Sequence, residues 1–406
     1  MRSLFALLAV AGVFVGALLP RASAAVEAVT LRVALYPYVP DRRAVFTLLA
    51  QEFQKRNPGV ILQFVEVPAD QDYYGGGLSA LDADVYEIDS ILLSDVMGKI
   101  APLSISLQGF DPAAVEAVTR DGLVYAVPHW MCGNFLFYRK DNIGIRDAVT
   151  WADLAKALAK QRKALMIDLF GRLTLGEWYI TMLADRLGMA SAQSAILSSN
   201  TPDPQVVADL NAVLTACPTG ACRSKDLHDR AGFYARAFIR GEAAAYIGYS
   251  ETLYYALKER IDNCRMTSPC LMPDEIAVRR LPKLSSSSTT EGVGWVDGLA
   301  ISNTLDAPTK AVALKFVEFA TSPDAYGLIL QPEWMDAPRY LLPARTGLSF
   351  GNDTPLYSSL LAAHAGRKTG TATGLNAKLR DLAKKLTCAL PIDRTDAATM
   401  SNCPVQ

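Results

Sequence analysis

Cys132 is a residue with clear capacity for covalent chemistry in this sequence. It lies in the segment AVPHWMCGNFLFYRK, between two apolar runs. A thiol becomes a nucleophile when a base removes its proton, because the thiolate is the attacking species. Free cysteines are also among the residue types most often buried as small hydrophobic groups. Taken alone, Cys132 is explained more simply as an inert, packed side chain.

Glu251 is the candidate base for this thiol. It follows the segment YIGYS at the expected start of a helix, and burial could raise the pKa of its carboxyl group well above ~4.3. Ser250 is expected to cap that helix, and a helix N-terminus favours a charged carboxylate by ~0.3–1 kcal/mol. An acidic residue in the first turn of a helix is common. The local pattern therefore leaves both interpretations of Glu251 open.

The N-terminus of the chain has the pattern of an export signal. The stretch MRSLFALLAVAGVFVGALLPRASAA combines an early arginine, an apolar run from Leu4 to Leu19 and a small-x-small site. This pattern predicts cleavage after Ala24 and a secreted or periplasmic mature protein. The apolar run is shorter than the ~20 residues of a membrane-spanning helix, and no later segment approaches that length. We therefore expect no membrane insertion.

The other cysteines form three close pairs. Short loops are the least costly to close, and an oxidising compartment favours disulfides, although sequence alone does not determine the connectivity. The predicted pairs are Cys217 with Cys222, Cys264 with Cys270, and Cys388 with Cys403. This pairing leaves Cys132 over, and a leftover thiol in a secreted protein is either buried and inert or reactive.

The composition argues against several functional classes. The formal net charge is −1 and a fifth of the residues are charged, whereas nucleic-acid-binding proteins usually show a basic excess or stripe. His129, His228 and His364 are scattered, and no metal-ligand spacing or CxxC occurs. The segment YYGGGL (73–78) lacks the ending of a phosphate loop and is expected to form a flexible loop. We expect no metal, organic cofactor or nucleic-acid partner.

The chain alternates between strand and helix patterns, and its 406 residues suffice for two domains of ~150 residues each. The stretch 29–40 predicts a strand, residues 41–59 a helix with Asp41 as its N-cap, and VILQFVEV a second strand. This order predicts parallel strands with a right-handed crossover. Thr150–Lys160 predicts a capped amphipathic helix.

In their order these elements resemble the type II periplasmic solute-binding proteins. The segments that carry the resemblance are VTWADLAKALAK, FIRGEAAAYIGYSE and LAISNTLDAPTKAVALKFVEFATSPDAY. The resemblance implies an α/β fold of two lobes, with mixed sheets flanked by helices and a ligand cleft between the lobes. The expected division is a signal peptide over 1–24, a first lobe over 25–130 and 297–345, and a second lobe over 131–296 and 346–406.

Five segments also resemble the thiaminase I family, whose enzymes have this fold. They are LYPYVPD (35–41), DVYEIDSILLS (84–94), VPHWMCGNFLFYRK (127–140), YIGYSE (246–251) and RYLLPAR (339–345). The resemblance implies that Cys132 is the nucleophile and Glu251 its base. It implies that the thiolate adds to the pyrimidine of thiamine, the thiazole departs, and an amine, pyridine or thiol takes its place.

The resemblance further implies a site for a flat cation. Carboxylates can bind an aminopyrimidine edge, and aromatic faces attract a thiazolium by ~0.5–2 kcal/mol each. Asp297 lies in the apolar segment GWVDGLA, where an unpaired acidic residue would be costly to bury. The predicted substrate-binding residues are Tyr36, Tyr73, Tyr74, Asp84, Asp89, Tyr249, Trp295 and Asp297.

Three positions depart from the family pattern. Trp295 stands where a tyrosine is expected, Gly133 where a hydroxyl residue is expected, and His129 is of an unexpected type. His129 could relay protons because histidine titrates near neutrality, or it could be a hydrogen-bonded wall residue. The departures concern the range of substrates more than the chemistry.

Two functional hypotheses follow from the sequence. The first is a secreted, monomeric thiaminase I that acts on thiamine and a small nucleophile without a cofactor. The second is a non-enzymatic binding protein that delivers thiamine or a related heterocycle to an ABC importer; a carrier of sugars or peptides is a weaker third. The pair of Cys132 and Glu251, which a carrier does not need, favours the enzyme.

Overall fold

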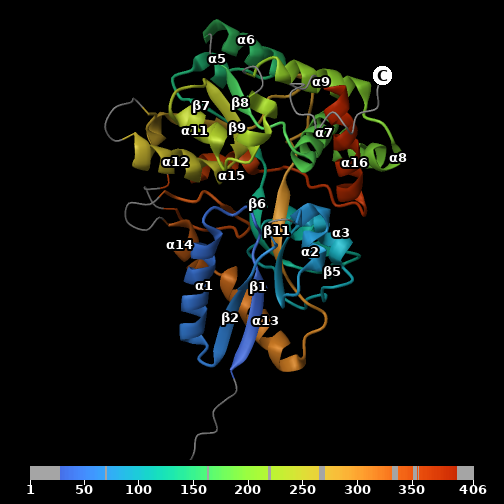
Figure 1. Cartoon of the computed structure of the whole chain (residues 1–406), viewed down its shortest axis with the longest axis vertical. Coiled ribbons are helices and arrows are strands. Elements are labelled where there is room, and N and C mark those ends of the chain that lie inside the picture. Colours follow the sequence, from blue (N-terminus) through green and yellow to red (C-terminus); the bar gives the residue numbers. More distant parts are fainter. Residues whose placement is uncertain are drawn as a thin grey trace, which may run out of the picture.

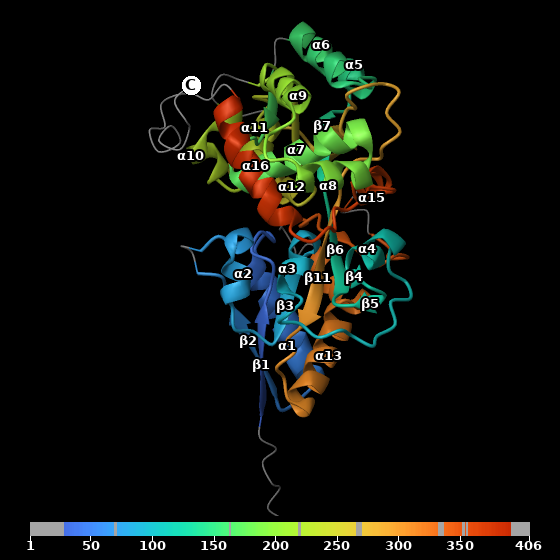
Figure 2. The same cartoon turned by 90° about the vertical axis from the view of Figure 1, so that its right-hand side faces the viewer.

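The protein consists of two α/β lobes stacked along its long axis, with strands β6 (Val127–Cys132) and β11 (Trp295–Ile301) leading up to their junction (Figures 1 and 2). The computed structural model describes residues 28–68, 71–161, 164–217, 221–264, 270–331, 337–350, 354 and 356–390. The expected signal peptide, residues 1–24, lies outside these ranges. No helix in the described ranges is long and apolar enough to span a bilayer.

The first lobe is built on a six-stranded sheet of order β12-β6-β11-β3-β1-β2. Besides β6 and β11, its strands are β1 (Val29–Ala34), β2 (Val60–Val65), β3 (Val85–Asp89) and β12 (Leu342–Pro343). Strand β1 pairs in parallel with β2 and β3, whereas β11 runs antiparallel to β3 and β6. The predicted β-α-β unit is confirmed, but its first strand ends at Ala34, and Tyr36 N donates to the Glu87 carboxylate instead of to a neighbouring strand.

Helices cover both faces of this sheet. They are α1 (Arg42–Arg56), α2 (Gly77–Ala80), α3 (Leu93–Val96), α4 (Pro112–Ala117), α13 (Ala307–Ala320) and α14 (Pro323–Leu330), with 3-10 turns η1 (Tyr73–Gly75) and η2 (Ser90–Leu92) and a hairpin of β4 (Thr119–Arg120) and β5 (Leu123–Val124). Asp41 holds the N-cap position of α1, as predicted, but its side chain makes no capping hydrogen bond. Phe53 of α1 packs edge-on against Phe316 of α13 with ring centroids 5.3 Å apart, which joins the two helices in one core.

The second lobe has a four-stranded sheet of order β10-β7-β9-β8. Its strands are β7 (Asn134–Arg139), β8 (Leu165–Ile167), β9 (Ala245–Tyr249) and β10 (Ile276–Arg279). Its helices are α5 (Ile143–Arg146), α6 (Trp151–Gln161), α7 (Arg172–Leu187), α8 (Met189–Ser198), α9 (Pro204–Leu214), α10 (Lys225–His228), α11 (Phe233–Ile239), α12 (Thr252–Asn263), α15 (Tyr357–His364) and α16 (Leu375–Ala389), with 3-10 turns η3 (Ala221–Arg223) and η4 (Pro273–Glu275). The mixed sheets flanked by helices confirm the predicted fold class.

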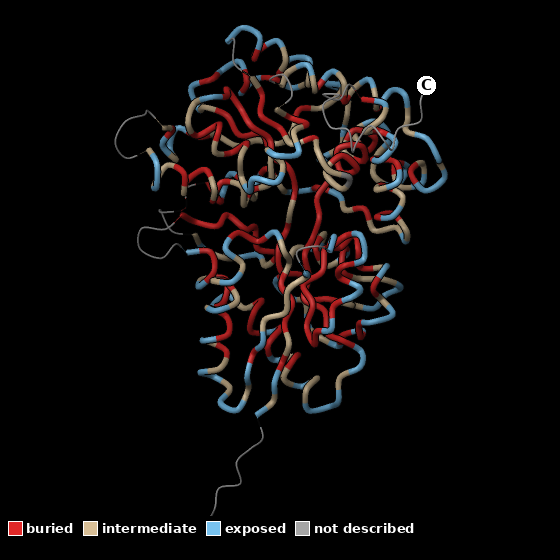
Figure 3. The backbone as a smooth tube through the Cα atoms, viewed as in Figure 1, coloured by how far each residue is buried: buried red, intermediate tan, exposed pale blue. Residues whose placement is uncertain are grey.

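The junction is made where the chain passes from one sheet to the other. Between β6 and β7 a single residue, Gly133, separates the first sheet from the second. The segment that enters β11 lies beside it, and Gly294 N donates to the carbonyl of Lys368, which places a later segment in the same layer. Figure 3 shows buried residues in the middle of each lobe and along parts of this junction. We retain the lobe boundaries at 130, 296 and 345 as a proposal.

Two of the predicted disulfides are present. Cys217 is bonded to Cys222, and Cys264 to Cys270. Cys403, the predicted partner of Cys388, lies outside the described residues, so the third pair stays a prediction.

Candidate active site

Cys132 lies at the end of β6, where the chain leaves the first sheet, and it is a free, partly exposed thiol. Its Sγ donates to Asp297 Oδ2 over 3.2 Å. Burial, and then repulsion from Asp297, Glu251 and Asp89, raises the pKa of the Cys132 thiol well above its usual range. The resting thiol is therefore protonated at neutral pH, and a base must remove its proton before it can attack.

Asp297 lies directly opposite Asp89 in the pairing of β11 with β3. Burial and the neighbouring charge of Asp89 raise the pKa of Asp297 well above its usual range, and burial raises the pKa of Asp89 to about 6. Two carboxylates this close do not both ionise readily, so we infer that the pair retains a proton near neutrality. Asp297 Oδ1 is buried and has no hydrogen-bond partner among the described residues, which leaves this atom available to a ligand.

Glu251 sits between β9 and α12, at the N-cap position of that helix. Burial raises the pKa of Glu251 to about 7, so this carboxyl group can exchange a proton at neutral pH. Its charge is one of those that act on Cys132. The predicted Ser250 cap is wrong, because α12 begins one residue later than expected. The Ser250 hydroxyl instead faces the Glu251 carboxylate, with Oγ 3.4 Å from Oε2.

Tyrosines of the first lobe form a hydrogen-bonded chain that ends on Asp89. The hydroxyls of Tyr36 and Tyr74 are hydrogen-bonded to each other, and Tyr74 also donates to Asp89 Oδ2 over 2.8 Å. Tyr73 packs edge-on against Tyr36 with ring centroids 5.4 Å apart, and its hydroxyl donates to the carbonyl of Glu87. The predicted residues Tyr36, Tyr73, Tyr74 and Asp89 are therefore brought together.

The prediction of a flexible loop over 73–78 is wrong. This stretch contains the 3-10 turn η1 and the start of α2, and both Tyr73 and Tyr74 are buried. The Asp72 carboxylate accepts hydrogen bonds from Tyr74 N and Gly75 N, and so caps the turn. The capping carboxylate and the packed rings outweigh the freedom that the glycines would allow.

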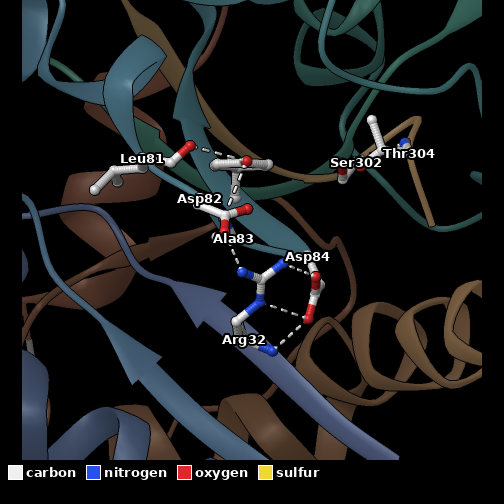
Figure 4. A network of polar contacts seen from close by, with 8 residues as sticks. Arg32, Leu81, Asp82, Ala83, Asp84, Ser302 and Thr304 are labelled. Carbon is white, nitrogen blue, oxygen red and sulfur yellow. Dashed lines mark hydrogen bonds and ion pairs between the residues drawn. The ribbon is translucent and has the colours of Figure 1, made fainter.

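The structure does not bring Asp84 to this site. Asp84 immediately precedes β3, at the end of the strand opposite Asp89, and Figure 4 shows its carboxylate bound to Arg32 of β1. Arg32 donates from its backbone N and from Nη2, each over 2.7 Å, and also contacts Asp82. This ion pair fastens β3 to β1, so the role of Asp84 is structural and its predicted contact with substrate is wrong.

Glu177 of α7 is a site residue that sequence reasoning missed. Its buried carboxylate accepts hydrogen bonds from Tyr249 Oη, from Trp295 Nε1 over 3.3 Å and from Asn134 Nδ2 over 2.9 Å. Burial raises the pKa of Glu177 to about 7. One signal in the sequence could have found it: the stretch RLTLGEWYITML is apolar around a single acidic residue. A helix that packs against a core seldom carries a buried glutamate unless that glutamate has a hydrogen-bond partner.

His129 is completely buried beside Glu87. Its Nδ1 lies 2.6 Å from Glu87 Oε1, and Glu87 Oε2 accepts from Tyr36 N over 2.7 Å. Through Glu87 the imidazole thus supports the backbone of Tyr36. This position agrees with the alternative of a hydrogen-bonded wall residue.

Gly133 is explained by Arg367, which lies against the crossing from β6 to β7. A β-carbon at position 133 would overlap Arg367 Nη1 and lie 3.2 Å from the carbonyl oxygen of Val293. Arg367 is held there because Nη1 donates to Val293 O over 3.1 Å and Nη2 to Asn134 O over 2.7 Å. The hydroxyl residue expected at this position is therefore excluded by the arginine.

This overlap predicts that Gly133→Ala lowers the free energy of unfolding by ~1–3 kcal/mol, the usual effect of overpacking. Urea denaturation of the single variants and of the double variant with Arg367→Ala measures the effect. Gly133→Ala should be less harmful once the guanidinium is gone. Purely additive effects would contradict the explanation.

Within the described ranges, no group of three or more His, Cys, Asp and Glu side chains could hold a metal ion. The arrangement instead supports covalent and proton-transfer chemistry. The free thiol of Cys132 and the Glu251 carboxyl group, with its pKa near neutrality, lie near each other where the two sheets meet. Beside them is a wall of tyrosines, formed by Tyr36, Tyr73 and Tyr74.

Comparison with known proteins identifies the class. Residues 46–349 match the family model of bacterial extracellular solute-binding proteins, and the chain belongs to that family. It is similar to thiaminase-1 of Paenibacillus thiaminolyticus, with 27% identity over 397 residues that cover 92% of this chain and 91% of the relative.

Solved structures extend this likeness. Thiaminase I from Bacillus thiaminolyticus superposes with a TM-score of 0.73 at 24% identity, covering 89% of this chain and 100% of that one. Clostridium botulinum thiaminase I in complex with thiamin also gives 0.73, at 23% identity and coverages of 88% and 98%. The predicted resemblance to thiaminase I is confirmed.

Proposed function

We propose that this protein is a thiaminase I, a transferase that replaces the thiazole of thiamine by another nucleophile through a cysteine-linked pyrimidine. The observation that carries the proposal is the meeting of Cys132, a free thiol, with Asp297 and Glu251 beside a wall of tyrosines. The similarity to thiaminase-1 over nearly the whole chain supports the same activity.

Each of these residues has a separate role in the proposed reaction. Asp297 and Asp89 bind the aminopyrimidine edge and support a protonated ring, which becomes a better electrophile. Glu251 takes the thiol proton as the Cys132 sulfur forms its bond to the pyrimidine. The bond to the thiazolium then breaks, and the thiazole leaves with the electron pair. The incoming nucleophile replaces it, and the C–S bond breaks as the thiol recovers its proton.

The first test incubates the mature protein with thiamine and an excess of pyridine. Mass spectrometry should detect the pyridine-exchanged pyrimidine and free thiazole, because pyridine is a neutral nucleophile that can attack where the thiazole left. Protein denatured before mixing is the control. Thiamine that remains intact while native mass spectrometry shows it bound would contradict the enzyme and favour the carrier.

The carrier is the second candidate because the matched family is one of solute-binding proteins. A thiamine carrier would use the same tyrosines and carboxylates for binding but would have no need of a base near Cys132. The extracellular family also supports secretion, together with the predicted cleavage after Ala24. A monomer remains our expectation for the oligomeric state.

A further inference from the structure

Glu177 lies where an acidic side chain is expensive to place. It lies in the second turn of α7 beside the buried residues Trp178 and Ile180, and it is itself 6% exposed. A buried carboxylate without partners is strongly destabilising. Glu177 instead accepts from three donors, which together satisfy both of its oxygens.

These donors come from both sheets. Tyr249 ends β9 and Asn134 begins β7, and these two residues are partners in the second sheet. Trp295 begins β11 of the first sheet, where it is the partner of Cys132. One carboxylate of α7 therefore holds the ends of strands from two sheets beside the thiol.

The contacts of Glu177 also indicate that it is not the base that removes the proton of Cys132. Asn134, Tyr249 and Trp295 each donate to it, whereas the thiol of Cys132 donates to Asp297. A general base must reach the proton that it removes. Glu177 is therefore placed to accept hydrogen bonds that hold the side chains of Tyr249 and Trp295 in position.

We propose that Glu177 is a positioning residue for thiamine, which acts by fixing Tyr249 and Trp295 in one arrangement beside Cys132. The inference rests on the proposed function. Rings that are already fixed lose no further conformational entropy when a flat cation binds against them, which favours thiamine affinity. The same fixed arrangement orients thiamine for attack by Cys132, which favours the reaction rate. The departure at position 295 fits this role, because the indole N–H reaches Glu177.

The test compares Glu177→Ala with Glu177→Gln. Alanine removes the acceptor, whereas glutamine keeps the length and can accept from Trp295 while the hydroxyl of Tyr249 accepts from its amide. We expect Glu177→Ala to weaken thiamine binding by ~10-fold and to lower kcat/KM for pyridine exchange by ~10–100-fold, whereas Glu177→Gln stays within ~3-fold of the unmodified protein. Calorimetry of thiamine binding and the exchange assay give the two readouts.

Glu259→Gln is the matched control. Glu259 is a buried glutamate of α12 that binds Arg236 and Arg240. Its replacement should lower the Tm without changing thiamine affinity. A positioning role also requires coupling, so Glu177→Ala should have little further effect on affinity in a protein that already carries Tyr249→Phe and Trp295→Phe.

Three results would overturn the proposal. They are equal impairment by Glu177→Gln and Glu177→Ala, a lowered Tm with unchanged thiamine affinity, and full additivity with the ring variants. Binding is measured without turnover. If the unmodified protein binds thiamine but exchanges nothing, the proposed transferase fails while the calorimetric comparison still decides the role of Glu177.

Discussion

Replacing Cys132 by alanine should lower the rate of pyridine exchange by ~10⁴-fold or more while the protein still binds thiamine. The thiol supplies the electron pair for the covalent step, and the alanine side chain has no group that can replace it. The fold should survive, because Cys132 is partly exposed and alanine is smaller. Mass spectrometry of the products and calorimetry of thiamine binding measure the two quantities separately.

Cys132→Ser is the matched comparison. The serine hydroxyl can still donate to Asp297, as the thiol does over 3.2 Å, but it is far harder to ionise. Loss of exchange in both variants with thiamine affinity preserved assigns the sulfur as nucleophile. Exchange at an undiminished rate in Cys132→Ala would remove the covalent mechanism.

A trapped intermediate gives independent evidence. When the unmodified protein is mixed with thiamine and quenched before an acceptor is added, its mass should rise by that of the pyrimidine group. Peptide mapping should place the added mass on Cys132. The same treatment of Cys132→Ala is the control and should leave the mass unchanged.

Sequence patterns predicted the strands and helices better than the contacts between them, and the roles of Cys132 and Glu251 stay predictions. Apolar periodicity and turn residues determine where strands begin and end, and they located Cys132 at the end of a strand. They do not indicate which end of a strand faces the site. Asp84 and Asp89 flank one strand, and a rise of ~3.3 Å per residue separates them by ~17 Å. Only pairing with β1 and β11 shows that Asp89 meets the site and Asp84 meets Arg32.

Contacts between residues distant in sequence explain why other features of the site were not predicted. Glu177 approaches the site from α7, and its three donors are distant in sequence from it and from one another. Gly133 depends on Arg367, which follows it by more than two hundred residues. The prediction that Ser250 caps α12 failed for a local reason. The helix begins one residue later than expected, so Glu251 and not Ser250 holds the N-cap position.

Glu251→Gln should lower kcat/KM for exchange by ~10²–10⁴-fold, the usual contribution of a general base. Glutamine has nearly the same shape but cannot accept the thiol proton as a base. Thiamine affinity should change little, because the proposed contacts to the pyrimidine come from Asp89 and Asp297. The exchange assay and binding calorimetry of the purified variant measure both effects.

The pH dependence decides whether Glu251 or Asp297 is the base. Only the ionised carboxylate can take the proton, and burial raises the pKa of Glu251 to about 7. In the unmodified protein kcat/KM should therefore fall as pH drops below about 7 and level off above it. Glu251→Gln should lose this step. Asp297 is the rival because it accepts the thiol hydrogen bond. If Glu251→Gln keeps the step and Asp297→Asn abolishes it, Asp297 is the base and Glu251 only tunes the charge around Cys132.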